Sequence, residues 1–213
     1  MDLIEFGLEC NLHCLFFMPR ANRILQADFP YHVRLRSINK MTFEMPLGDL
    51  WDFSCDLLLF CTYAFKIEIH AFVLMNNHYH MILRTPNANL DKFMSYFNKC
   101  LSREIGFKTS RINQKFGGRY RASIISDLSY YHHAYKYVYR NPVEAKVCDL
   151  TEDYRYSSIN FVLGRDSYRF PVFDSYFQDI EDHWPVLSWL NTSYKSDEAK
   201  IIKSGLKKTH FQF

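Results

Sequence analysis

The sequence predicts an α+β fold in which an antiparallel sheet carries helices on one face and is followed by a further helix. Four short segments show the alternation or the apolar runs of strands, and two longer segments between them repeat apolar residues at helical spacing. Turn residues bound these segments. With 213 residues, 48% of them hydrophobic and 23% charged, the chain has room for one core of moderate size and is not intrinsically disordered.

The first half is predicted to run strand, helix, strand, strand. Residues 31–37 alternate apolar and polar side chains, as a half-buried strand does. Residues 48–64 have apolar residues near helical spacing, and residues 66–75 and 78–84 are two apolar runs. Asn76-Asn77 lies between those runs, and asparagine tolerates the left-handed conformation that a tight hairpin turn needs.

The second half is predicted to continue with a helix and a strand. Asn89 is a candidate N-cap, and the apolar stripe that follows it runs to Gly106, where the helix is expected to end. Gly117-Gly118 indicates a turn, and residues 119–125 have the character of a fourth strand. The resulting β-α-β-β-α-β order is that of a ferredoxin-like or RRM-like α+β sandwich. Its open sheet face is where we expect a site.

A last strong helix follows the sheet. Asp127 is its expected N-cap, and Asn141-Pro142 is expected to stop it after Arg140. Beyond residue 160 the pattern weakens, and it predicts only short helical pieces near 172–191 and 195–205.

Composition argues against several classes of protein. No stretch approaches the roughly 18 apolar residues of a membrane span, and residues 1–20 carry three acids where a secretory signal would be basic. Seven glycines are few for a glycine-rich nucleotide fold. Six scattered cysteines suit a reducing compartment, so we expect a cytoplasmic protein. Cys10, His13 and Cys14 resemble half of a zinc site, but no second ligand pair lies at suitable spacing.

Charge is distributed unevenly along the chain, although the net charge is only +3. Residues 92–140 hold ten Lys and Arg against two Asp and Glu, a balance of +8. Residues 1–91 hold seven against ten, and residues 143–213 hold nine against eleven. Aromatic residues interleave with the basic stretch, which is the combination that phosphate attraction and base stacking require. The pattern favours nucleic-acid binding, with a solvated basic surface as the plainer interpretation.

Two histidines two residues apart begin the predicted strand 78–84. Because side chains alternate along a strand, His78 and His80 project from the same face while Tyr79 points to the other. Two neighbouring imidazoles are half of a divalent-metal site. In a chain with nine histidines, such a pair can also arise by chance.

The helix after Asp127 offers a candidate nucleophile. At 100° per residue one sector forms an apolar stripe, which holds Leu128, Tyr131, Tyr135, Val138 and Tyr139. Tyr137 lies nearly opposite this stripe, with Asn141 one turn further on the same side. A phenolic hydroxyl beside a cation can attack a phosphodiester, whereas a tyrosine on the non-core face is usually only a surface residue.

These motifs together resemble those of the HUH single-tyrosine transposases. The resemblance rests on the run His70 to His80, on Gly117-Gly118-Arg119-Tyr120 and on the run Tyr137 to Ala145. It extends to Asp153–Ser158 and to the first strand, Tyr31-His32-Val33, and covers roughly residues 18–160. Within this family, the sequence most resembles the branch of REP-associated tyrosine transposases.

The resemblance implies a metal-dependent endonuclease and strand transferase that acts on single-stranded DNA, including strands that form hairpins. It implies that His78, His80 and Asn141 bind Mg²⁺ or Mn²⁺, and that Tyr137 forms a 5′-phosphotyrosine intermediate. Asparagine at position 141 reaches less far toward a metal than the glutamine common in the family. It also implies a transposase domain at 18–160, with extensions at 1–17 and 161–213.

Arg119, Arg121 and Lys136 are our candidates for contacts with the DNA backbone. Two alternatives to the strand transferase stay open at this point: a binding module for structured DNA or RNA that does not cleave, and a hydrolase in which His78 and His80 activate water. The sequence is compatible with a monomer or a homodimer.

Overall fold

The computed structural model describes residues 23–110, 114–167, 169–174, 176, 182–195 and 197–211. The predicted extension 1–17 and the Cys10–Cys14 pattern lie outside these residues. Within these ranges, no helix combines the length and the apolar character needed to cross a membrane.

The sheet is four-stranded and antiparallel, as predicted. Its strand order is β2-β3-β1-β4, so β1, the first strand of the described residues, lies inside the sheet between β3 and β4. The turn at Asn76-Asn77 joins the neighbouring strands β2 and β3. The strands are β1 (Tyr31–Arg36), β2 (Glu68–Leu74), β3 (His78–Arg84) and β4 (Arg121–Ile124).

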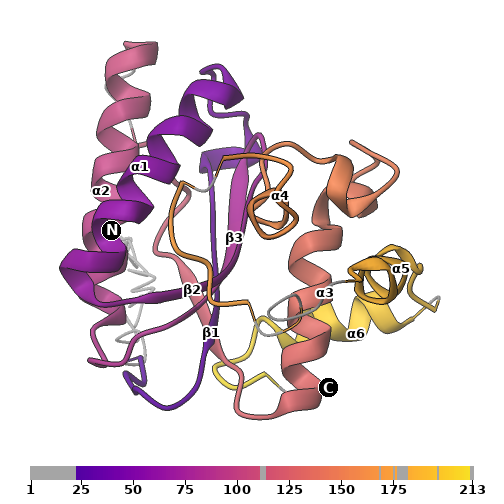
Figure 1. Ribbon diagram of the computed structural model, residues 1–213. Coiled ribbons are helices and arrows are strands. Elements are labelled where there is room, and N and C mark those ends of the chain that lie inside the picture. Colours follow the sequence, from indigo (N-terminus) through magenta and orange to yellow (C-terminus); the bar gives the residue numbers. More distant parts are fainter. Residues whose placement is uncertain are drawn as a thin grey trace, which may run out of the picture.

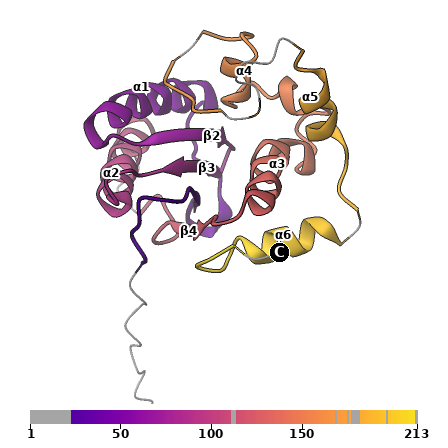
Figure 2. The same cartoon turned by 60° about the horizontal axis from the view of Figure 1, so that its bottom comes forward.

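Helices cover both faces of this sheet, whereas the sequence pattern placed the packed helices on one face and left the other open. The two long helices α1 (Leu47–Phe65) and α2 (Leu90–Thr109) lie on one side, and α3 (Leu128–Glu144) packs over β2 and β3 on the other (Figures 1 and 2). The sheet therefore lies between two hydrophobic cores. Helix α3 makes most of its sheet contacts with β2 and β3, and a pocket opens beside β1, β3 and β4.

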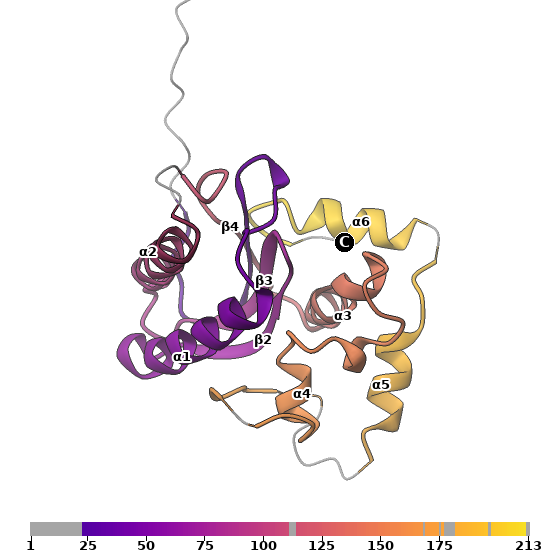
Figure 3. The same ribbon diagram turned by 90° about the horizontal axis from the view of Figure 1, so that it is seen from above.

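Short elements complete the described chain. The helices α5 (Trp184–Asn191) and α6 (Glu198–Gly205) pack against α3, as Figure 3 shows from above. They confirm the predicted helical pieces in part. The others are η1 (Ile38–Lys40), η2 (Thr151–Asp153) and α4 (Ile159–Val162). Near the C-terminus, Phe211 N–H donates to Ile124 O at 2.8 Å, so this segment runs along the edge of β4.

Alternation along β1 explains how one strand serves a core and a site at once. Tyr31, Val33 and Leu35 are buried in the core beneath α1 and α2. The residues between them, His32 and Arg34, therefore face the α3 side.

Two predicted helix ends were wrong. Helix α2 runs past Gly106 to Thr109, and the left-handed residue that ends it is Ser110, with φ 54°. Helix α3 runs past Pro142 to Glu144, because the N–H groups of the residues that follow donate to the carbonyls of Asn141 and Pro142 and close the last turn. Asn141 consequently belongs to the helix, one turn after Tyr137.

The predicted stripe on α3 is confirmed except at its first residue. Tyr131, Tyr135, Val138 and Tyr139 are buried, but Leu128 is 72% exposed. Leu128 is the first residue of the helix, where the chain has only just left β4.

Candidate active site

Strand register gathers five polar side chains on the α3 side of the sheet. Arg34 pairs with His80, and Arg36 pairs with His78, across the β1–β3 ladder. On the other side of β1, Arg34 pairs with Arg121 of β4. Because directly paired residues point to the same face, these side chains form one polar patch.

Helix α3 brings the candidate nucleophile to this patch. Asp127 caps the helix by accepting hydrogen bonds from the N–H groups of Ser129, at 2.7 Å, and of the next residue. Ten residues on, the ring of Tyr137 meets that of His80 edge to face, with 5.5 Å between the centroids. The ring of His32 lies 6.0 Å from Tyr137. Tyrosine and histidines therefore meet within a single chain.

His78 and Asn141 are oriented like two ligands of one ion. Asn141 donates from Nδ2 to Tyr137 O at 3.2 Å, so its Oδ1 is the atom turned to His78. Asn77 donates from Nδ2 to Lys40 O at 2.8 Å, and its Oδ1 accepts from His78 Nδ1–H at 2.5 Å. His78 Nε2 is then unprotonated and lies 3.3 Å from Asn141 Oδ1.

Two lone pairs that face each other at this distance fit a cation between them. Adjacent ligands of an octahedral ion with bonds of about 2.1 Å are about 3 Å apart. Among the described residues, no group of three or more His, Cys, Asp or Glu side chains could hold a metal ion. A site at this place therefore depends on the amide of Asn141 as a third ligand beside His78 and His80.

Burial determines the protonation of these groups. It lowers the pKa of His78 to about 4 and the pKa of His80 well below its usual value, and the cations Arg34 and Arg36 act in the same direction. Both imidazoles are therefore neutral at pH 7, as metal ligands must be. Burial raises the pKa of Tyr137, although Asn141 and the two arginines partly offset this, so the phenol is protonated at rest.

A pocket of about 670 Å³ opens beside the patch. Both His78 and His80 line it, so the imidazole pair is accessible to solvent although His80 is only 2% exposed. The rest of the lining is strongly basic, and the described residues that contribute a positive charge are Arg23, Arg34, Arg36, Lys40, Arg119 and Arg121. An anionic ligand is the natural occupant of such a pocket.

The sequence-predicted DNA contacts divide into two groups. Arg119 and Arg121 line the pocket, and Arg119 also pairs with Asp91 at 3.0 Å. Lys136 lies elsewhere: it is 8% exposed, and its ammonium lies 5.5 Å from the ring centre of Trp189 and 5.3 Å from that of Tyr194. This position suits a cation–π contact between α3 and the C-terminal segment, away from the basic pocket that Arg119 and Arg121 line.

Sequence reasoning did not select three residues that the structure places at the site. Arg34 and Arg36 line the pocket, and His32 contacts the ring of His80. The signal was present in the alternation of residues 31–37, which puts all three on the face opposite to the core.

Two comparisons with known proteins give matches. Residues 54–141 match the sequence family described as "Transposase IS200 like", and this range includes His78, His80, Tyr137 and Asn141. Among solved structures, the chain is similar to a REP-associated tyrosine transposase bound to a REP hairpin, with a TM-score of 0.60 and 15% sequence identity over 84% of this chain and 96% of that chain. A search of curated proteins gives no match. Residues 54–141 thus match the IS200-like transposases in sequence, and the chain is similar in fold to a REP-associated tyrosine transposase.

Proposed function

We propose that this protein is a metal-dependent endonuclease and strand transferase for single-stranded DNA, with Tyr137 as its nucleophile. The observation that carries the proposal is the meeting of Tyr137 with His78, His80 and Asn141 beside one basic, solvent-accessible pocket. Each group alone has a plainer interpretation. Together they supply a nucleophile, a ligand set and an anion site.

The reaction needs no further reactant to cut and rejoin a strand. Tyr137 Oη attacks the phosphorus of a phosphodiester, a bond forms between this oxygen and the 5′-phosphate, and the bond to the 3′-oxygen breaks. The phenolic proton is transferred to the leaving oxygen, which departs as a 3′-hydroxyl. Since the phosphotyrosine keeps the bond energy, a 3′-hydroxyl can attack it and reverse the step.

His78, His80 and Asn141 are the residues that would hold Mg²⁺ or Mn²⁺ here. The bound cation supplies a positive charge that stabilises the charge developing on the phosphate oxygens. The neutral imidazoles are suitable ligands without loss of a proton at pH 7.

The arginines of the pocket are suited to hold the DNA backbone on both sides of the scissile phosphate. Arg34, Arg36 and Arg121 stand on adjacent strands of the same face, and guanidinium groups bind phosphates in a bidentate manner. The solved relative was bound to a REP hairpin, so single strands that fold into hairpins are the first substrates to test.

A covalent-adduct assay tests the proposal. Oligonucleotides labelled at the 3′ end are incubated with the protein and Mn²⁺, because the 3′ part of the strand stays on the tyrosine. We expect a labelled protein band on a denaturing gel that Tyr137→Phe abolishes and Tyr130→Phe retains. Tyr130 is the matched control, since it lies on the same helix and packs on Phe211.

Two other results would each reject the proposal. Binding without any adduct would indicate the non-cleaving binding module, and cleavage that survives Tyr137→Phe would indicate a hydrolase that uses water.

A further inference from the structure

A second buried imidazole, that of His32, contacts the ring of the candidate ligand His80. His32 Nε2 lies 2.8 Å from His80 Nδ1, and the two rings are stacked with 5.1 Å between their centroids and 16° between their planes. Both residues are at most 2% exposed. His32 itself does not line the pocket, whereas His80 does.

We propose that His32 is a positioning residue, which accepts a hydrogen bond from His80 Nδ1–H and so presents Nε2 of His80 to the cation, and that Ser123 supports His32 in turn. This inference rests on the proposed function, because it concerns how the same site holds its metal ion.

The direction of the hydrogen bond follows from proton counting. A neutral imidazole carries one proton, and a nitrogen that binds a metal carries none. His80 Nδ1 contacts His32, so Nε2 is the nitrogen left for the cation and the proton stays on Nδ1. His32 Nε2 must then accept, which places the proton of His32 on its own Nδ1.

Ser123 is our candidate acceptor for the proton on His32 Nδ1. It is the direct partner of His32 across the β1–β4 ladder and is fully buried. Side chains of directly paired residues have Cβ atoms about 5 Å apart. His32 Nδ1 and Ser123 Oγ are both buried without a hydrogen-bond partner among the described residues. A change of the Ser123 χ1 rotamer would move Oγ, and our proposal includes that Oγ then accepts from His32 Nδ1–H, which completes the chain Ser123–His32–His80.

A purely structural role does not account for this arrangement. On β3 the direct partner of His32 is the apolar, buried Ile82. An aromatic hydrocarbon ring at position 32 would fill similar space, so packing alone does not require an imidazole here. We therefore expect His32→Phe to remain folded while the metal site weakens, a combination that a packing role would not produce.

Metal affinity is the direct test, measured as bound Mn²⁺ by electron paramagnetic resonance on the full chain without DNA. His32→Phe should weaken Mn²⁺ binding by about 10- to 100-fold, the usual effect of losing the partner of a metal-bound histidine. His32→Gln should recover most of the affinity, because its amide oxygen can accept from His80. Ser123→Ala should weaken binding less, in the same direction. Val33→Ala, which alters the core on the other face of β1, should leave the affinity unchanged.

Nitrogen-15 spectra of the histidine rings in the Mg²⁺-loaded protein provide a second measurement. The wild type should show His80 with its proton on Nδ1, and His32→Phe should lose this preference. If wild type and His32→Phe bind Mn²⁺ equally and show the same tautomer, the positioning role is refuted and the proposed function stands. If the wild type has no Mn²⁺ site that His78→Ala removes, the metal site of the proposed function fails, and this inference fails with it.

Discussion

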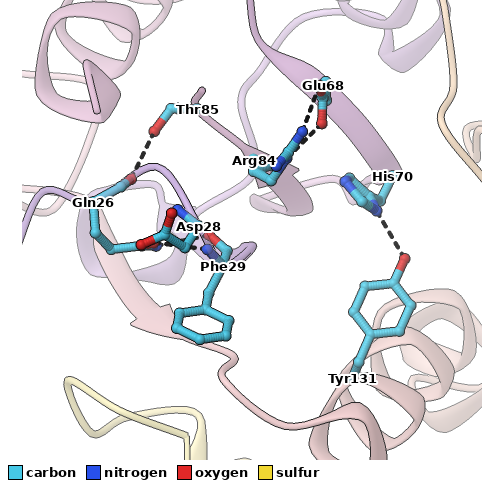
Figure 4. A network of polar contacts seen from close by, with 8 residues as sticks. All are labelled: Gln26, Asp28, Phe29, Glu68, His70, Arg84, Thr85 and Tyr131. Atoms are coloured by element: carbon cyan, nitrogen blue, oxygen red, sulfur yellow. Dashed lines mark hydrogen bonds and ion pairs between the residues drawn. The ribbon is translucent and has the colours of Figure 1, made fainter. Parts of the chain in front are cut away.

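Buried histidines should make the folded protein less stable in acid. The contribution of His70 to this loss of stability can be measured with one substitution. His70 lies on β2 outside the pocket, and its Nδ1 is 2.9 Å from Tyr131 Oη (Figure 4). Its Nε2 is buried without a hydrogen-bond partner in the described part of the chain. Burial lowers the pKa of His70 to about 4, Glu68 opposes this shift and Arg84 adds to it. Glu68 and Arg84 pair with each other at 2.7 Å in the same figure.

The sign and size of the effect follow from the two pKa values. Well above pH 6.5 the imidazole is neutral in both states and contributes nothing to the pH dependence. As the pH falls from 6.5 toward 4, the unfolded chain takes up a proton that folded His70 does not accept, so the free energy of unfolding decreases. For these pKa values the loss at pH 5 is about 2 kcal/mol.

Urea unfolding of the metal-free protein at pH 7.5 and pH 5 measures this loss. In His70→Gln the decrease between the two pH values should be smaller than in the wild type by about 2 kcal/mol. Tyr131→Phe serves as the control: it removes the hydrogen-bond partner but leaves the imidazole buried, so it should keep the pH-dependent part. An equal decrease in wild type and His70→Gln would refute the assignment.

Three further substitutions test other parts of the structure. Arg140→Met should lower the free energy of unfolding by roughly 2–3 kcal/mol in urea titrations, because this buried guanidinium donates at 3.0 and 2.8 Å to two carbonyls at the end of α5. Asn141→Ala should weaken Mn²⁺ binding on the order of tenfold or more while Asn141→Asp retains it, since the third ligand atom is an oxygen. Arg34→Gln should weaken single-strand binding and reduce the slope of log K against log salt by about 0.7, whereas Lys136→Gln should leave the slope unchanged.

Local patterns predicted the elements of the sheet well, because they depend on neighbours in the sequence. The hairpin at Asn76-Asn77 and the cap at Asp127 both lie where expected, although neither Asn76 nor Asn77 adopts the left-handed conformation that the sequence suggested. The predicted stop before Pro142 was wrong because a proline in the last turn removes only one hydrogen bond, which later residues compensate. The second covered face could not be read locally, since it depends on where α3 docks.

Within the candidate site, too, the sequence could pair only residues that lie close together along the chain. His78 with His80, and Tyr137 with Asn141, share a face through spacings of two and four residues, so sequence alone could pair them, and their chemical roles stay predictions. His32 could not be paired with His80 in this way, because 48 residues separate them and only the register of β1 against β3 joins them.

The charge of a pocket on a sheet depends more on strand register than on the charge balance of any one stretch of sequence. The basic stretch 92–140 contains Arg119 and Arg121, but it also contains Lys136, which the fold places against aromatic rings. Arg34 and Arg36 line the pocket although their segment of the chain has an acidic balance. Insertion of β1 between β3 and β4 sets these two arginines beside His78 and His80, so a central strand can supply the pocket with positive charge from outside the basic stretch 92–140.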